Sequence, residues 1–385
     1  EEKGSAQGFH QTNISQVYGF SFFDKDRSNI FTTSLYYKHK FTKNSELELR
    51  LAYNINNNKY SANRTDFYDK QLIEDDSRYD NKRHSGSFNI DYSKEFTNNG
   101  SLIAGSRSTL VMDEINNVIG ENPLFKHHNY NQYVYVGYGG SYKFLRYNAS
   151  IGLEGIWAKA GEVSYNYFRP RGNVSTTWVI NSHNSVRLSY RLTNTAPNVA
   201  YLNPYNTSTD SLLVSIGNPG LKPQMTQYAS VSYTLNVGKL YLTPAVDYKY
   251  ISDLIETYGY SKDGVYYSTY TNTGHFIQTS AGADLSYRFK WGRIYAGGGW
   301  KTCHYTGQDA KNSAYASFGF NAHAKDFSFY GDVDYNSRDY TALACTKYVR
   351  PSVANLQVNY NITPDFYIGM CLQHITGEYQ SKTTT

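Results

Sequence analysis

Two short segments contain residue types that could coordinate a metal ion. Residues 24–29 read DKDRSN and begin like a calcium-binding loop, but Asn29 occupies the place of the required turn glycine. Leu35 stands where such a loop needs its closing glutamate, so we expect a charged hairpin turn instead. His127 and His128 lie in a polar stretch and could touch a metal chelate, although solvated loop histidines are the simpler interpretation.

The cysteines do not form a recognisable site. Cys371 and His374 cannot share a metal, because positions three apart on a strand point to opposite faces. Three cysteines in all are too few for a disulfide scaffold. The sequence also contains no nucleophile elbow, zinc-protease helix or phosphate-binding loop. It therefore predicts that the protein is not an enzyme and has no bound metal or cofactor.

The segment 196–223 is the best candidate for ligand binding. It is long, uncharged from Thr193 to Thr209, and mixes aromatic with amide side chains. Such a mixture suits sugars, peptides or organic chelates, and the alternative is that its proline and asparagine residues only shape an ordered loop. The candidate residues are Asn198, Tyr201, Asn203, Tyr205 and Asn206.

The chain on either side of this loop must hold it in place, and there apolar and polar residues alternate with a period of two from end to end. In residues 240–256 the even positions are mostly apolar or aromatic, and the odd positions include Asp247 and Lys249. A helix would spread each apolar set around its whole surface. We therefore predict about seventeen strands, beginning near residues 14, 30, 47, 82, 101, 131, 147, 171, 185, 224, 240, 273, 293, 313, 327, 351 and 366.

The predicted connections alternate between tight turns and long polar loops, which is typical of an up-and-down barrel with two different rims. The tight turns are expected at 42–45, 97–100, 145–146, 181–184, 238–239, 290–292, 325–326 and 363–365. The long loops are expected at 61–81, 114–130, 161–170, 196–223, 257–272 and 340–350.

The apolar faces of these strands are predicted to meet lipid. No apolar run approaches the roughly 18 residues of a spanning helix, but barrel strands need only every second residue to be apolar. The chain has 40 Tyr, 19 Phe and 4 Trp, and many lie near predicted strand ends, where interfacial belts place them. Residues 1–385 are thus predicted to form one all-β domain, part of a transmembrane antiparallel barrel.

The polar faces would then line a wet lumen. Opposite charges at similar depth suit that environment, and they could contact ligand, contact another domain or, as the favoured alternative, pair with one another. The predicted lumenal charges are Arg187, Arg191, Asp247, Lys249, Asp284 and Arg288. With 37 basic against 32 acidic residues and no basic stripe interleaved with aromatics, no nucleic-acid partner is expected.

Residues 185–235 contain the string GNPGLKP, which is followed at once by an alternating strand that begins with Gln224. The positions of the motif are Gly217, Asn218, Pro219, Leu221, Lys222 and Pro223. This pattern resembles the outer-membrane barrels of TonB-dependent receptors from Bacteroidetes-type bacteria, a family that usually has Glu where Gln224 stands. The rest of the chain matches that family in its tyrosine-rich strands, tight turns and long loops.

The resemblance implies a barrel of about 22 strands with an N-terminal plug. It implies import of a siderophore or other metal chelate, an oligosaccharide or a peptide across the bacterial outer membrane. The implied partners are outer-membrane lipid, the TonB complex acting through a plug missing from this sequence, and a surface lipoprotein. Because plug, signal peptide and a closing aromatic strand are missing, we expect this sequence to be the C-terminal barrel portion of a receptor.

Two other functions remain open on the sequence. One is a passive pore or surface-binding barrel without energy coupling, and the other is a soluble, secreted glycan-binding β-protein.

Overall fold

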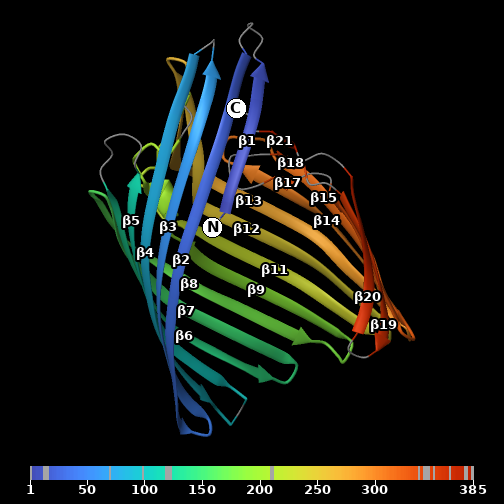
Figure 1. Cartoon of the computed structure of the whole chain (residues 1–385). Coiled ribbons are helices and arrows are strands. Elements are labelled where there is room, and N and C mark those ends of the chain that lie inside the picture. The colour runs from blue at the N-terminus through green and yellow to red at the C-terminus, as the bar shows by residue number, and fades with distance from the viewer. Residues whose placement is uncertain are drawn as a thin grey trace.

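The computed structural model is almost entirely β-structure, and Figure 1 shows its strands wrapping into a tilted, curved wall. It describes residues 2–11, 17–68, 71–97, 99–117, 124–208, 212–336, 339–340, 347–349, 352–363, 366–376 and 380–382. Within these residues, no helix has the length and apolarity needed to cross a membrane.

The wall is an antiparallel meander in which each long strand pairs with the next. From the first to the ninth, the strands are β1 (Glu2–Gln11), β2 (Val17–Thr42), β3 (Ser45–Tyr68), β4 (Gln71–Glu95), β5 (Ser101–Asn117), β6 (Phe125–Tyr142), β7 (Leu145–Ala160), β8 (Val163–Val179) and β9 (Asn184–Thr195). The meander continues with β11 (Gln224–Val237), β12 (Leu240–Lys262), β13 (Val265–Arg288), β14 (Gly292–Tyr305), β15 (Lys311–Ala324), β16 (Phe327–Asn336), β19 (Ser352–Thr363) and β20 (Phe366–Thr376).

Four short strands and one short helix complete the described structure. Helix α1 (Val199–Leu202) and strand β10 (Leu213–Ser215) lie in the connection between β9 and β11. A separate small sheet contains β17 (Asp339–Tyr340), β18 (Lys347–Val349) and β21 (Gln380–Lys382). The predicted all-β antiparallel architecture is therefore confirmed.

One rim of the wall carries tight turns, most of them where the sequence predicts them. The turn expected at 145–146 lies instead at 143–144, because Leu145 and Arg146 already belong to β7. Lys143, Gly238 and Lys325 have φ angles of 53°, 60° and 52°, values that two-residue hairpin turns require. Each of these positions joins two strands directly, at β6–β7, β11–β12 and β15–β16. The predicted turn at 363–365 lies partly outside the described residues.

Three predicted long loops are wrong, because the strands continue through them. β3 and β4 extend through most of 61–81, β8 begins at Val163, and β12 and β13 meet at a two-residue turn. Asp263 and Gly264 form that turn with φ angles of 51° and 80°. Cross-strand tyrosine pairs stabilise the extension, as where the rings of Tyr260 and Tyr267 stack 5.1 Å apart.

A fourth predicted loop, at 114–130, is shorter than predicted, because β5 runs to Asn117 and β6 begins at Phe125. The loop predicted at 340–350 lies mostly outside the described residues.

The N-terminal assignment also needs correction. The two strands predicted to begin near 14 and 30 are one strand, β2, and β1 precedes it. Residues 24–29 are extended backbone inside β2, so they form neither a calcium loop nor the expected hairpin turn. β2 alternates weakly in sequence, which is why its length could not be read from period two.

The two faces of the wall differ as the alternation predicts. On the convex face, large apolar side chains are exposed, among them Val246 (52%) and Leu285 (42%). In the part of the chain that the structure describes, buried apolar residues gather in two small clusters and not in one continuous core. One contains Ile251, Leu254, Phe276, Cys303 and Tyr305, and the other holds the connection between β9 and β11.

Candidate functional site: the lumenal wall and its inserted loop

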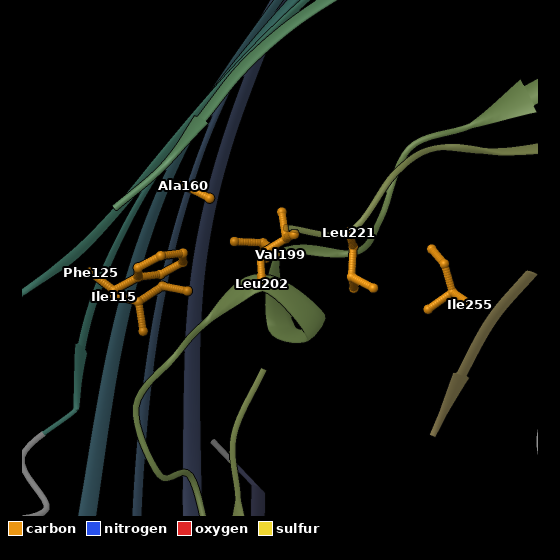
Figure 2. Packing of buried hydrophobic residues seen from close by; sticks show 7 residues of the cluster. All are labelled: Ile115, Phe125, Ala160, Val199, Leu202, Leu221 and Ile255. Atoms are coloured by element: carbon orange, nitrogen blue, oxygen red, sulfur yellow. The ribbon is translucent and has the colours of Figure 1, made fainter. Parts of the chain in front are cut away.

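The connection between β9 and β11, of which the structure describes residues 196–208 and 212–223, folds back against the inner wall of the barrel. Its helix α1 is capped by Asn198, whose side-chain oxygen accepts a hydrogen bond from the Ala200 amide at 3.1 Å. Val199 and Leu202 are buried at 7% and 0% exposure. They belong to one buried cluster with residues from β5, β6, β7 and β12, in which Leu221 lies between α1 and β12, as Figure 2 shows. The strand residues of the cluster are Ile115, Phe125, Ala160 and Ile255.

Backbone and amide contacts fix the loop to β13. β10 pairs in parallel with residues 266–268 of that strand. The Lys222 amide donates to Asn272 Oδ1 at 2.7 Å, and Asn272 Nδ2 donates back to the Lys222 carbonyl at 3.1 Å. Asn218 Nδ2 donates to the Tyr270 carbonyl at 2.9 Å. The described part of the loop is thus an ordered insert held against the wall.

The five predicted ligand-binding residues all lie in this insert. Asn203 is 1% exposed, and its oxygen accepts from the Tyr205 amide at 3.2 Å. Asn206 accepts from the Ser208 and Ser215 amides at 3.0 and 2.9 Å. In these contacts the amide side chains organise the loop backbone, as the alternative interpretation of the sequence expects.

The two tyrosines of the predicted set have different surroundings. Tyr201 stacks on Tyr270 with ring centroids 4.2 Å apart. Tyr205 borders a cavity of about 550 Å³ at the rim, together with Pro204 and Pro219. Ligand binding by the five residues stays a prediction, with Tyr205 the member that borders open space.

The GNPGLKP string supplies the second half of the insert. Gly217 makes the closest approach, because a Cβ there would lie 2.6 Å from the carbonyls of both Asn203 and Tyr201. Leu221 is 1% exposed in the cluster of Figure 2. Pro223 is buried, and Gln224 begins β11. The string therefore returns the chain from the loop to the wall.

The register places the six predicted lumenal charges on the concave face. Arg191 pairs with Tyr228, which pairs with Lys249, so these three side chains share one rung. The guanidinium of Arg191 lies 5.8 Å from the Tyr228 ring centroid, and the Tyr228 hydroxyl donates to Asp247 at 2.5 Å. Arg187, Asp284 and Arg288 have the same parity on their strands.

Several charged contacts of this wall could not be predicted from the sequence of any single strand. Glu154 is 2% exposed and accepts hydrogen bonds from Arg171 at 3.1 Å and Asn194 at 2.9 Å. Arg169 spans from β8 to β12 and bonds Asp253 at 2.9 Å. These contacts join neighbouring or distant strands, so only the register reveals them.

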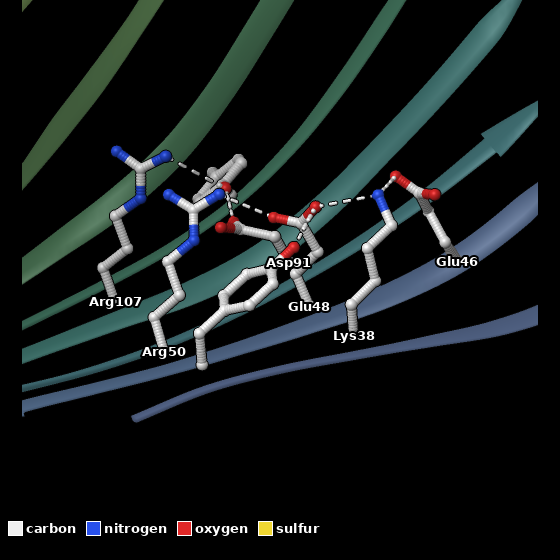
Figure 3. A network of polar contacts seen from close by, with 8 residues as sticks. Lys38, Glu46, Glu48, Arg50, Asp91 and Arg107 are labelled. Atoms are coloured by element: carbon white, nitrogen blue, oxygen red, sulfur yellow. Dashed lines mark hydrogen bonds and ion pairs between the residues drawn. The ribbon is translucent and has the colours of Figure 1, made fainter. Parts of the chain in front are cut away.

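Further polar contacts of this kind lie on β2, β3, β4, β5 and β6 near the tight-turn rim (Figure 3). Lys38 bridges Glu46 and Glu48 at 2.8 and 3.2 Å, and Arg50 bonds Glu48 at 2.6 Å. Further along the same face, Asp91 accepts a hydrogen bond from Tyr135, whose hydroxyl also lies 3.4 Å from Arg107. These contacts bring acidic and basic side chains together on a wall that faces water.

A buried triad lies at the opposite, long-loop end. Asp113 is fully buried and bonds Arg83 at 2.6 Å and His127 at 3.1 Å. Burial opposes ionisation of Asp113, but the bonds from His127 and Arg83 outweigh it and hold the pKa of the carboxyl below its ordinary value. The expectation of a solvated loop histidine is therefore wrong for His127, whereas His128 is exposed.

The described residues contain no cluster of three or more His, Cys, Asp or Glu side chains that could hold a metal ion. Cys303 and Cys371 are both free of disulfides.

Comparisons with known proteins identify this architecture. Residues 39–361 match the sequence profile of the Outer membrane protein beta-barrel family. The chain belongs to that family. It is therefore located in the bacterial outer membrane, which rules out the soluble, secreted alternative. The sequence itself matches no curated protein.

Solved structures with a similar fold are transporters and receptors. The copper transporter OprC has a TM-score of 0.64 at 10% identity, over 92% of this chain and 71% of that one. The ferric-catecholate import receptor Fiu from E. coli K12 scores 0.62 at 11% identity, over 96% and 69%. The FrpB iron transporter from Neisseria meningitidis scores 0.61 at 9% identity, over 100% and 77%. At such identities the similarity concerns the fold.

The outer-membrane barrel places its convex face in lipid, and two rows of aromatic residues mark the interfaces. The ring centroids of Trp157 and Tyr130 lie 5.6 Å apart. Near the tight turns, those of Trp178 and Phe144 lie 6.1 Å apart. Trp157 pairs with Asn166 on β8. The segment of β8 from Asn166 to Trp178 is about 40 Å long at ~3.3 Å per residue. At a tilt of ~45° this spans about 28 Å, close to the apolar band of ~25 Å expected for such barrels.

Proposed function

We propose that this barrel is the membrane-spanning part of an energy-coupled outer-membrane receptor that imports a scarce nutrient. In this proposal the ligand enters from the long-loop rim, which faces outward in outer-membrane barrels. A plug domain in the lumen then responds to the TonB complex in the inner membrane. A surface lipoprotein is a further candidate partner at the outer rim.

The observation that carries the proposal is the size of the wall together with what its lumen contains. Seventeen long strands in the described residues give a barrel too wide for its own side chains to fill. The ordered insert between β9 and β11 packs against the lumenal side of this wall, where the cluster of Figure 2 holds it. A wide lumen with an ordered loop packed inside it suits captured ligands better than free diffusion.

The named solved structures favour one ligand class. Those described above are named as copper or iron transporters or as a ferric-catecholate receptor, and another is a ferripyoverdine receptor with ferripyoverdine bound, with a TM-score of 0.60 at 10% identity over 96% of this chain and 65% of that one. We therefore place a metal chelate first among the substrates, ahead of an oligosaccharide or a peptide.

Uptake by cells tests the proposal. Cells that carry the protein should accumulate a radiolabelled ferric chelate, oligosaccharide or peptide from a panel, and accumulation should stop when TonB is depleted or the proton-motive force is collapsed. Uptake that continues under both treatments would instead indicate a passive pore. In that case proteoliposomes containing the protein should also swell in small sugars.

A further inference from the structure

Three arginine side chains border one cavity in the lumenal wall. Arg107 on β5, Arg171 on β8 and Arg191 on β9 surround a space of about 180 Å³. Among the described residues that border it there is no carboxylate. Ser150, Asn173 and Thr193 add neutral hydrogen-bonding groups at its edge. The charged side chains that border the cavity are therefore all positive.

Two tyrosines hold the guanidinium groups in place. The guanidinium of Arg171 lies 4.9 Å from the Tyr133 ring centroid, and that of Arg107 lies 5.2 Å from Tyr135. The two rings stack with centroids 5.1 Å apart and planes 14° apart. Gly152 permits this, because a Cβ there would lie 2.7 Å from the Tyr133 ring. A stacked guanidinium leaves its N–H edge available to a planar oxyanion.

One of the three arginines is paired with a carboxylate outside the cavity lining. Arg171 donates to Glu154, which also accepts from Asn131 and Asn194 and is 2% exposed. Arg107 and Arg191 contact tyrosines instead, and it is those tyrosines, Tyr135 and Tyr228, that donate to Asp91 and Asp247. Among the described residues, these two guanidinium groups therefore make no direct ion pair with a carboxylate.

We propose that this cavity binds a carboxylate or phosphate group of a small anionic ligand on its way through the lumen. Arginine forks bond such oxyanions in a bidentate manner, and desolvation in a narrow wall cavity strengthens each bond. The inference rests on the proposed transport function only for the ligand's route, since binding itself can be measured on the purified protein.

The test uses protein purified from outer membranes in detergent. Citrate and inorganic phosphate are titrated by calorimetry into the wild type, Arg191→Gln, Arg191→Lys and Arg107→Gln/Arg191→Gln. Each lost arginine should weaken binding by roughly tenfold to a hundredfold, and the lysine variant should fall between, because it keeps charge but loses the fork. Arg171 is left intact, because its loss would strand the buried Glu154.

Arg293→Gln is the matched control. Arg293 also lies over a tyrosine, Tyr295, at 6.0 Å, but it borders a different cavity that includes Asp284. The Arg293→Gln variant should bind anions as the wild type does. All variants should keep the wild-type difference in migration between heated and unheated samples on SDS gels. Equal losses in Arg293→Gln and Arg191→Gln would overturn the site, as would undetectable binding by the wild type. Energy-coupled uptake of a neutral ligand would persist in that case, so the two proposals fail separately.

Discussion

We expect one substitution, Leu202→Ala, to detach the inserted loop from the barrel wall. Leu202 is fully buried in the cluster that joins α1 to Phe125 on β6 and Ile255 on β12. Truncating a buried leucine costs about 2–5 kcal/mol, depending on how far the cavity collapses. Because Leu202 packs the loop and not the strand ladder, we expect this cost to appear as local opening of 196–223.

A local cost of about 3 kcal/mol raises the opening equilibrium constant by roughly a hundredfold. Hydrogen exchange measured by mass spectrometry should therefore show faster exchange in peptides covering 199–221, while peptides from β6 and β12 keep their protection. Leu212→Ala is the control, since Leu212 belongs to the same loop but is 45% exposed. The reasoning fails if the loop keeps its protection, or if the strands lose theirs to the same extent.

Two further perturbations probe the wall. Gly105→Val should push Tyr135 away from Asp91, because a Cβ at Gly105 would lie 2.7 Å from each of their side-chain oxygens; we expect about 1–3 kcal/mol lower stability in denaturant unfolding. Gly86→Val, whose Cβ would meet its nearest atom at 4.0 Å, should cost much less, and equal costs would contradict the explanation. Asp113 has a folded pKa below its ordinary value, so its contribution is full above about pH 4 and is lost as pH falls through the folded pKa. Asp113→Asn should therefore lower stability at neutral pH and flatten this acid-side loss, and a variant that keeps the wild-type slope in unfolding measured from pH 5 to 3 would disprove it.

Period two was enough to predict the class of fold and most tight turns, because side-chain alternation is a local property of a strand. It could not predict where strands end above the bilayer, where both faces are wet and polar residues continue along an extended strand. The extension of β12 and β13 had one local signal, the dipeptide Asp263-Gly264, which is strongly typical of a two-residue hairpin turn.

The lumenal site depended on information that no single strand contains. The parity of Arg191 and Lys249 predicted their common face, but the rung that joins Arg83, Asp113 and His127 depends on the register of three strands. A register slip of one residue would send each side chain to the opposite face. For the same reason, the convergence of Arg107, Arg171 and Arg191 emerges only from the assembled wall.

The strands that replace the expected loops change what the cell presents to its surroundings. β2 has 26 residues, which at ~3.3 Å per residue and a tilt of ~45° rise about 60 Å, roughly twice the hydrocarbon thickness. Together with β1, β3 and β4 it forms a ribbon whose end is among the highest parts of the wall in Figure 1. Antibodies, phages and large molecules approaching the bacterium would meet this ribbon well before they reach the entrance to the lumen.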